Sequence, residues 1–143
     1  MKKVLITGIN GQDGTILSSI LIKKKFAVFG TTNKKIKKKI NNVKIVSTYN
    51  LNINKLIKKF DEIKPDIIVH FGSTNPSYYN SFTKKDYEYN LKFTKTIINY
   101  VAQKNIKFIF PSSSSIFKYW EIKFFTFREK AMNFLLLENQ FIY

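Results

Sequence analysis

A glycine-rich turn near the amino end restricts the folds open to this chain more than any other part of it. The turn reads Thr7-Gly8-Ile9-Asn10-Gly11-Gln12-Asp13-Gly14. A short apolar run within residues 1–8 leads into it and is typical of a buried strand, and apolar residues at helical spacing follow from Asp13. Glycines allow a tight turn, close approach of a phosphate and close packing of a helix on a sheet. Because a helix start also offers free N–H groups and a favourable dipole, the turn predicts a dinucleotide site.

The rest of the chain alternates apolar runs with segments of helical periodicity. The predicted strands are 26–31, 43–46, 67–71 and 106–110, and the predicted helices are 53–63 and 86–104. On the second of these helices, the residues predicted to face inward are Leu91, Ile97, Ile98 and Val101. The alternation predicts the α/β class: a doubly wound parallel sheet, or Rossmann fold, that is incomplete at its C-terminus.

Two segments of the chain differ in their patterning. Residues 1–117 are predicted to form a dinucleotide-binding Rossmann domain. Residues 118–143 are aromatic and weakly patterned, and we interpret them as a degenerate or truncated tail with a terminal helix over 129–140. Apolar side chains exposed on such a tail would favour self-association, so a homo-oligomer is one expectation.

The composition excludes several classes of function. The 143 residues include no cysteine and one histidine, His70, so the sequence offers neither a disulfide framework nor a metal site. His70 is expected to be a packed, hydrogen-bonded residue. No apolar run approaches the roughly 20 residues that span a bilayer, and a cytoplasmic setting without membrane contact is expected. The net charge of +16 is almost all lysine, with Arg128 the only arginine, so nucleic-acid binding is the weaker interpretation.

The spacing of the turn and its Gln12-Asp13 pair resemble the extended short-chain dehydrogenase/reductase superfamily, which contains the NAD-dependent epimerases and dehydratases. Within that superfamily the turn is most similar to the GDP-mannose 4,6-dehydratase group. The similarity continues in the same order along residues 1–117. Its further motifs are Asn50-Leu51, Lys64–Ser73, Asn90 and Phe108–Ser115.

The resemblance implies a set of cofactor-binding residues. The set is Thr7, Gly8, Asn10, Gly11, Gln12, Asp13, Gly14, Asn33, Lys34, Asn50, Leu51, Phe71, Gly72 and Ser73. An acidic residue after the second strand usually binds the ribose of NAD, whereas this chain has Thr32-Asn33-Lys34-Lys35 there. These side chains can donate hydrogen bonds to a 2′-phosphate, so NADP is the expected cofactor, with NAD as the alternative.

The resemblance also implies a catalytic Ser/Thr, a tyrosine base and a lysine. Ser113 aligns with the Ser/Thr. Tyr119 and Lys123 form a literal Tyr-x-x-x-Lys but follow Ser113 closely. Aligning the terminal helix instead places Lys130 at the lysine position, with no tyrosine four residues before it. The elimination step of the dehydratase group uses a glutamate where this chain has Ser115.

The function that the resemblance implies is an NADP-dependent nucleotide-sugar dehydratase acting on GDP-mannose. Its reaction would begin with hydride transfer at the sugar C4 and continue with loss of water. The incomplete catalytic pattern leaves a truncated or inactive member open. The alternatives are a catalytically inert nucleotide-binding module, a nucleotide-sugar epimerase and, less favoured, a basic RNA-binding protein.

Overall fold

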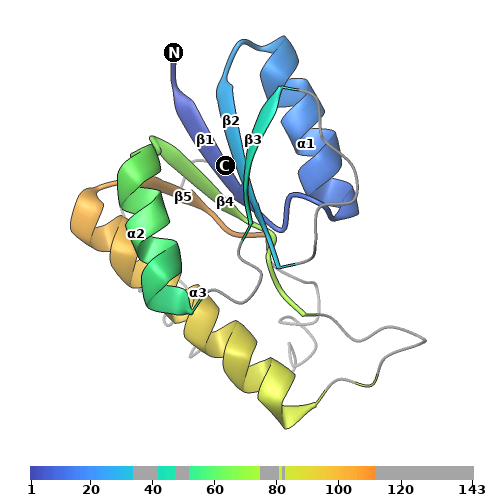
Figure 1. The fold of residues 1–143 in the computed structure, drawn as a ribbon, viewed down its shortest axis with the longest axis vertical. Helices are drawn as coiled ribbons and strands as arrows, with labels where there is room; N and C mark the ends of the chain where they lie inside the picture. Colours follow the sequence, from blue (N-terminus) through green and yellow to red (C-terminus); the bar gives the residue numbers. More distant parts are fainter. Residues whose placement is uncertain (34–41, 48–51, 75–80, 82, 112–143) are drawn as a thin grey trace, which may run out of the picture.

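The chain folds around one parallel β-sheet with helices on both of its faces (Figure 1). The computed structural model describes residues 1–33, 42–47, 52–74, 81 and 83–111. The elements are β1 (Lys3–Thr7), α1 (Gln12–Lys23), β2 (Ala27–Thr32), β3 (Val43–Ser47), α2 (Ile53–Ile63), β4 (Ile67–His70), α3 (Lys84–Lys104) and β5 (Lys107–Ile109). The predicted α/β architecture is therefore confirmed, as a Rossmann-like sheet.

The five described strands lie in the order β3-β2-β1-β4-β5, and every neighbouring pair is parallel. The central strand β1 pairs with β2 on one side and β4 on the other, so that Thr7 lies between Thr31 and His70. The chain changes direction across the sheet at β1, with β2 and β3 on one side and β4 and β5 on the other. In parallel α/β sheets, ligands bind beyond the carboxyl ends of the strands at such a switch point.

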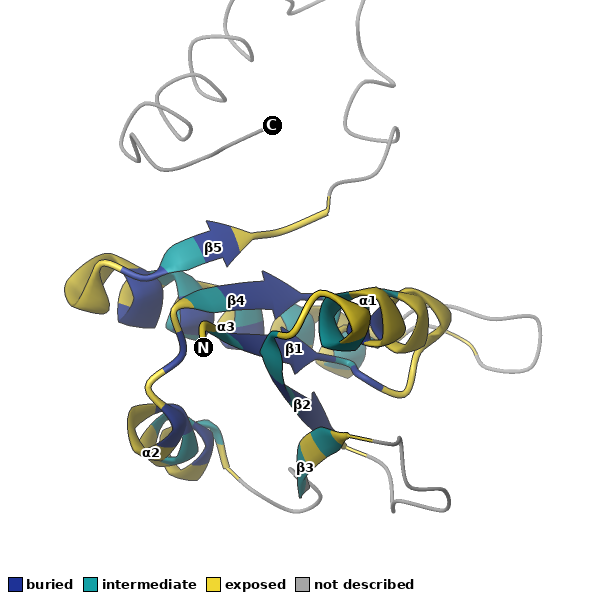
Figure 2. Ribbon diagram, turned by 90° about the horizontal axis from the view of Figure 1, so that it is seen from above, coloured by how far each residue is buried: buried dark blue, intermediate teal, exposed yellow. Residues whose placement is uncertain are grey.

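The two faces of the sheet have separate cores. Helix α1 covers one face, and α2 and α3 cover the other (Figures 1 and 2). The α1 side buries Val4 and Ile6 of β1, whereas the opposite side buries Leu5 of β1 against Phe60 and Ile97 of the two other helices. Strands buried on both faces are near-continuous apolar runs, which is why β1 and β4 could be predicted from their local sequence.

Most element boundaries agree with the sequence predictions to within two residues, and α2 agrees at both ends. The inward face of α3 was predicted wrongly at one position, because Leu91 is 42% exposed. Ile97, which is buried, lies six positions after Leu91. At about 100° per residue, Leu91 therefore points roughly 120° away from the direction of Ile97. The buried positions of α3 are Phe93, Ile97, Tyr100 and Val101. The tail 118–143 and its predicted helix 129–140 lie outside the described residues.

Candidate functional site

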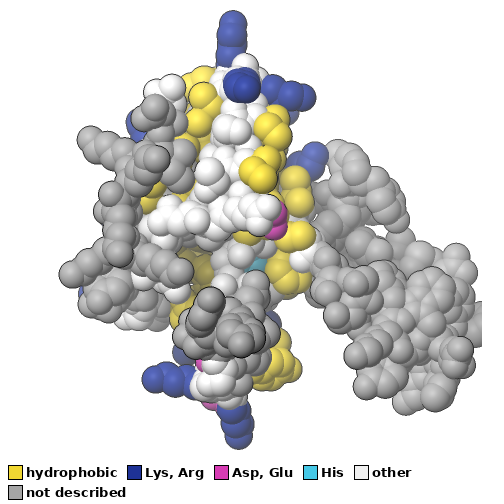
Figure 3. All heavy atoms as spheres, turned by 90° about the vertical axis from the view of Figure 1, so that its right-hand side faces the viewer, with side chains coloured by type: hydrophobic (Ala, Val, Ile, Leu, Met, Phe, Trp, Pro, Cys, Tyr) yellow, Lys and Arg dark blue, Asp and Glu magenta, His cyan; other side chains and the backbone are white. Residues whose placement is uncertain are grey.

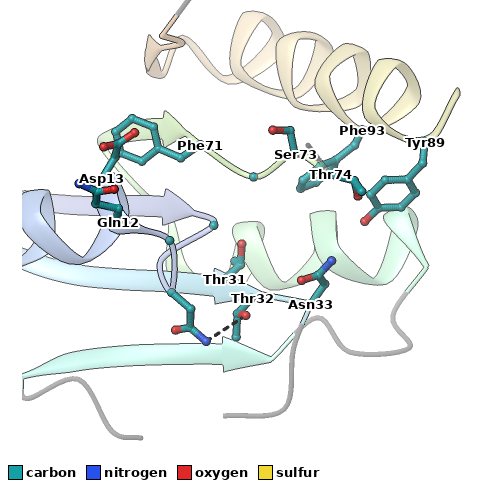
Figure 4. A pocket seen from close by; sticks show the side chains of 15 residues that line it. Gln12, Asp13, Thr31, Thr32, Asn33, Phe71, Ser73, Thr74, Tyr89 and Phe93 are labelled. Carbon is teal, nitrogen blue, oxygen red and sulfur yellow. Dashed lines mark hydrogen bonds between the residues drawn. The ribbon is translucent and has the colours of Figure 1, made fainter. Parts of the chain in front are cut away.

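A cavity of about 390 Å³ lies at the switch point, beyond the carboxyl ends of β1, β2 and β4 (Figure 4). The turn between β1 and α1 forms one wall, and the ends of β2 and β4 form the others. Side chains of α3 complete the lining on the side of β4. The lining residues are Gly8, Asn10, Gly11, Gln12, Asp13, Gly14, Thr31, Thr32, Asn33, Phe71, Gly72, Ser73, Thr74, Tyr89 and Phe93.

The absence of a side chain has a different structural consequence at each of the three glycines of the turn. Gly8 adopts φ +71°, the left-handed region that favours glycine. A Cβ on Gly14 would lie 2.6 Å from the Gly8 carbonyl oxygen and 2.8 Å from the Ile9 Cα, so α1 can approach the turn only without a side chain there. A Cβ on Gly11 would meet only the Gly8 oxygen, at 3.2 Å. The absent side chain of Gly11 thus leaves space at the cavity, whereas those of Gly8 and Gly14 allow the backbone its path.

The start of α1 presents backbone N–H groups at this cavity. Gly11 is the N-cap and supplies no side chain to cap the helix. The first helical hydrogen bond runs from Thr15 N to Gly11 O at 3.0 Å, and none joins the Gln12 or Asp13 N–H to another described residue. Such N–H groups, together with the helix dipole, attract phosphate. The residues present therefore fit a pyrophosphate.

The end of β2 forms the second wall and carries no carboxylate. Thr31 and Thr32 are buried, and Asn33 is exposed at the strand end. The Asn10 side-chain amide donates to Thr32 Oγ1 at 3.2 Å, which joins the turn to this strand. Asp13 is the acidic residue of the described lining, and it belongs to the opposite wall, in the first turn of α1. A ribose at the end of β2 would meet hydroxyl and amide groups.

Two hydrogen-bond clamps hold the turn after β4. The Gly72 N–H donates to Thr7 Oγ1 at 3.0 Å, which ties the turn to β1. The Thr74 N–H donates to Asn90 Oδ1 at 2.8 Å, and the Asn90 side-chain amide donates back to Thr74 O at 2.7 Å. Asn90 therefore pairs with the Thr74 backbone as a neighbouring strand would, and it ties the turn to α3.

His70 lies beneath this turn and is buried, as the sequence predicts. Its Nδ1 lies 2.6 Å from Thr7 Oγ1, and its Nε2 lies 3.0 Å from Thr94 Oγ1. The rings of Phe93, Phe108 and Phe110 surround the imidazole. Loss of hydration on burial lowers the pKa of His70 from 6.5 to about 4. The imidazole is therefore neutral at physiological pH.

The cavity brings together ten of the fourteen residues predicted to bind cofactor. They are Gly8, Asn10, Gly11, Gln12, Asp13, Gly14, Asn33, Phe71, Gly72 and Ser73. Thr7 lies behind the wall, fully buried, and contacts the site through Gly72. Lys34, Asn50 and Leu51 lie outside the described residues. The four residues considered for catalysis also lie outside them, namely Ser113, Tyr119, Lys123 and Lys130.

The cavity also contains residues that the predicted set lacked. They are Thr31, Thr74, Tyr89 and Phe93, together with Thr32, which was predicted only as a donor to the 2′-phosphate of NADP. The strand order alone would have placed the two β2 threonines beside the turn, since parallel neighbours of β1 end at the same edge. Tyr89 and Phe93 are four residues apart on α3 and so share a helix face. That this face reaches the cavity depends on the tilt of α3, which the sequence pattern does not give.

The lysines of the described part of the chain do not line the cavity. On the face that carries α1, the lysine side chains lie mainly toward the upper and lower ends (Figure 3). No group of three or more His, Cys, Asp or Glu side chains able to hold a metal ion occurs among the described residues. No helix within the described ranges is long and apolar enough to cross a membrane.

Known proteins share both the sequence pattern and the fold. The bifunctional polymyxin resistance protein ArnA of Wigglesworthia glossinidia brevipalpis is 32% identical over 130 residues, which are 82% of this chain and 19% of that protein. The Bordetella bronchiseptica enzyme WbmH, solved in complex with NAD+, matches with a TM-score of 0.56 and 24% identity over 76% of this chain and 38% of its own. The UDP-glucose 4-epimerase of Bifidobacterium longum, solved with NAD+ and UDP, matches with a TM-score of 0.67 and 22% identity.

The match to the epimerase covers 81% of this chain and 38% of that chain. The chain thus spans about a fifth of the curated relative and well under half of the solved structures that it resembles. The family model that describes the NAD dependent epimerase/dehydratase family matches residues 4–123, most of the length of the sequence. Together with the glycine turn and the parallel sheet, this match shows that the chain belongs to the NAD dependent epimerase/dehydratase family.

Proposed function

We propose that this chain supplies the cofactor-binding half of an NADP-dependent nucleotide-sugar enzyme of the GDP-mannose 4,6-dehydratase type. The observation that supports it most is the cavity between the glycine turn and the end of β2, where uncapped N–H groups meet a wall without a carboxylate. A nicotinamide cofactor would supply a hydride acceptor. The chain's own residues would bind and orient that cofactor. A cytoplasmic setting goes with this proposal, since the sequence has no cysteine that requires an oxidising compartment.

Each part of the cofactor has a proposed partner. The N–H groups of Gln12 and Asp13, beside the space left by Gly11, would hold the pyrophosphate. Thr32, Asn33 and Lys34 would contact the adenosine ribose and its 2′-phosphate. The sequence resemblance further assigns Asn50-Leu51 to the adenine and Phe71–Ser73 to the turn that lines the rest of the cofactor.

The choice of NADP over NAD depends on the end of β2. A carboxylate there would bind the ribose 2′-hydroxyl of NAD and repel the 2′-phosphate of NADP. This chain has Asn33 at that place, and lysines follow it in the sequence. The two solved relatives described above hold NAD+, so NAD is the alternative that the experiment must exclude.

The substrate is proposed to be a nucleotide sugar, with GDP-mannose favoured by the Gln12-Asp13 pair of the turn. Ser113 is proposed to polarise the sugar oxygen. Tyr119 is proposed as the base and Lys123 as its lysine. Lys130 is the alternative position for the lysine. A nucleotide-sugar epimerase is the second candidate, because one of the solved relatives is a UDP-glucose 4-epimerase. A catalytically inert nucleotide-binding module is the third, because Ser115 replaces the glutamate of the elimination step.

Titration of NADP and NAD+ into the full chain tests the cofactor proposal, and Asn33→Asp provides the matched variant. The unaltered chain is expected to bind NADP at least about tenfold more tightly than NAD+, and Asn33→Asp is expected to reverse that order. Equal binding of both cofactors, or tighter NAD+ binding by the unaltered chain, would overturn the choice of NADP. Absence of binding for both would overturn the nucleotide site itself.

Turnover then separates the candidate activities. Incubation with NADP and GDP-mannose should yield the 4-keto-6-deoxy sugar if the dehydratase proposal is correct. Interconversion of UDP-glucose and UDP-galactose without dehydration would favour the epimerase. Tight cofactor binding without either product would favour the inert module.

A further inference from the structure

A series of hydrogen-bonded polar groups, buried at its centre, runs from the cavity wall to α3. The Gly72 N–H donates to Thr7 Oγ1 at 3.0 Å, Thr7 Oγ1 lies 2.6 Å from His70 Nδ1, and His70 Nε2 lies 3.0 Å from Thr94 Oγ1. Thr7 is 0% exposed and His70 is 1% exposed, so these two side chains are shielded from solvent, whereas Gly72 and Thr94 are half-buried. Gly72 lines the cavity, and the other members of the series do not.

The donors and acceptors along this series of hydrogen bonds favour one tautomer of His70. A backbone N–H can only donate, so Thr7 Oγ1 accepts from Gly72 and retains its own hydroxyl proton. Within the described residues, His70 Nδ1 is the remaining polar partner of that hydroxyl. If Nδ1 accepts the proton, then Nε2 carries the ring proton and donates to Thr94 Oγ1. The opposite tautomer would leave the buried Thr7 hydroxyl proton without an acceptor, which is costly.

We propose that His70 is a positioning residue of the nucleotide site: as the neutral Nε2–H tautomer it orients the Thr7 hydroxyl, and Thr7 in turn fixes the Gly72 backbone at the cavity wall. This inference rests on the function proposed above, because Gly72 forms part of the wall of the proposed nucleotide site. The His70 ring is linked to the cavity lining through Thr7, which holds Gly72, and through the aromatic ring of Phe93.

The surroundings of the ring keep it neutral and hold it in place. Thr7 faces it from β1, Thr94 and Phe93 from α3, and Phe108 and Phe110 from the end of the sheet. None of these groups carries a charge that could stabilise an imidazolium, and burial lowers the pKa of His70 to about 4. An imidazolium would also donate from Nδ1 and so leave the Thr7 hydroxyl proton without an acceptor.

The position of Gly72 affects both walls of the cavity. A Cβ on Gly8 would lie 3.0 Å from the Gly72 N and Cα, so the two turns are in close backbone contact. A Cβ on Gly72 would lie 2.9 Å from Thr7 Oγ1 and 3.2 Å from Phe93. A displacement of Gly72 would therefore disturb the glycine turn as well as its own wall. The Thr7–His70 pair controls the backbone at the point where the turns meet.

Two pairs of variants isolate the link. Thr7→Val removes the hydroxyl and keeps the shape, whereas Thr7→Ser retains a hydroxyl. His70→Asn places an acceptor where Nδ1 stands, whereas His70→Gln keeps a group only at the Nε2 position facing Thr94. Both His70 variants replace the ring with a side-chain amide and lose its contacts with the surrounding phenylalanines, so the difference between them reports the bond to Thr7.

Three measurements on the full chain test the proposal. The ¹⁵N signals of the only histidine are expected to show a neutral ring protonated at Nε2. Thr7→Val and His70→Gln are expected to speed hydrogen exchange of the Gly72 amide about tenfold and to weaken NADP binding about tenfold. Rescue to within about threefold is expected for Thr7→Ser and His70→Asn, since they restore the missing group.

A ring protonated at Nδ1, or equal losses in His70→Asn and His70→Gln, would overturn the positioning role, because packing alone would then explain the losses. If the unaltered chain binds no NADP, the proposed function fails, while the ring signals and the Gly72 exchange still decide the link. If NADP binds and none of the four variants changes its affinity, the link fails and the proposed function stands.

Discussion

The three glycines of the first turn are the same residue with different tasks. At Gly8 the backbone conformation requires glycine, and at Gly14 the nearby backbone leaves no room for a side chain. Gly11 has an extended conformation, φ −73° and ψ 168°, that any residue can adopt. A sequence shows three glycines and a spacing, but only coordinates separate the one that leaves room for a ligand from the two that serve the fold.

This difference predicts opposite outcomes for two alanine substitutions. Gly14→Ala is expected to lower the free energy of unfolding by about 1–3 kcal/mol, because the new Cβ collides with backbone that no rotamer change can relieve. Gly11→Ala is expected to change the free energy of unfolding by less than about 1 kcal/mol but to weaken NADP binding about tenfold or more. Urea unfolding and cofactor titration measure the two quantities separately. Equal effects of both variants on stability and on binding would contradict the division of tasks.

At the scale of the elements, capping residues explain where α2 and α3 begin and end. Thr83 and Asp86 form a capping box at the start of α3: the Asp86 N–H donates to Thr83 Oγ1 at 3.2 Å, and the Thr83 N–H donates to Asp86 Oδ2 at 2.9 Å. At the start of α2, the Lys55 N–H donates to Asn52 Oδ1 at 2.9 Å, a side-chain cap on one side only. Both α2 and α3 end at a residue in the left-handed conformation, Lys64 and Asn105.

The capping box predicts a pH dependence that originates at α3. The hydrogen bond from the Thr83 hydroxyl is the main reason that the pKa of Asp86 lies below its usual 3.8. Because the pKa is lower in the folded state, the unfolded chain binds the proton more readily, so this contribution is complete above pH 3.8 and is lost as the pH falls through the folded pKa. As the pH falls below about 4, the free energy of unfolding of the unaltered chain should therefore fall more steeply than that of Asp86→Asn.

Thermal unfolding of both proteins across that pH range measures the difference. Thr83→Ala provides the control, since it removes the same hydrogen bond from the opposite side and should reduce the difference in slope. Parallel pH profiles for the unaltered chain and Asp86→Asn would show that the carboxylate contributes nothing to the start of α3.

Element boundaries were largely predictable, and element orientation was not. Apolar runs that end at Gly8 and at Pro111 mark strands and their limits, and Lys64-Pro65 marks the end of a helix before the next strand, because glycine and proline interrupt both regular structures. The error at Leu91 arose because a helix of 21 residues contains more apolar positions than one face can bury. Which of them face the core depends on where the sheet lies beneath the helix.

At the scale of the whole molecule, the site is a product of topology. Parallel strands around β1 bring the residues after β1, β2 and β4 to one edge, so ten predicted cofactor residues from three separate segments meet at one cavity. That convergence could be predicted once the strands were recognised as parallel. The bond between Thr7 and His70 could not, because 63 residues separate them and no local pattern links a threonine to a histidine on the neighbouring strand.

The central claim, that the glycine turn binds a nicotinamide dinucleotide, is tested most directly by labelling the five glycines of the full chain with ¹⁵N and adding NADP. Gly8, Gly11, Gly14 and Gly72 line the cavity, whereas Gly30 lies against the Ile9 side chain and outside it. We expect saturable shifts of the four lining glycines, with that of Gly11 among the largest, and the smallest shift at Gly30. Unchanged signals at these four positions under saturating NADP would contradict it.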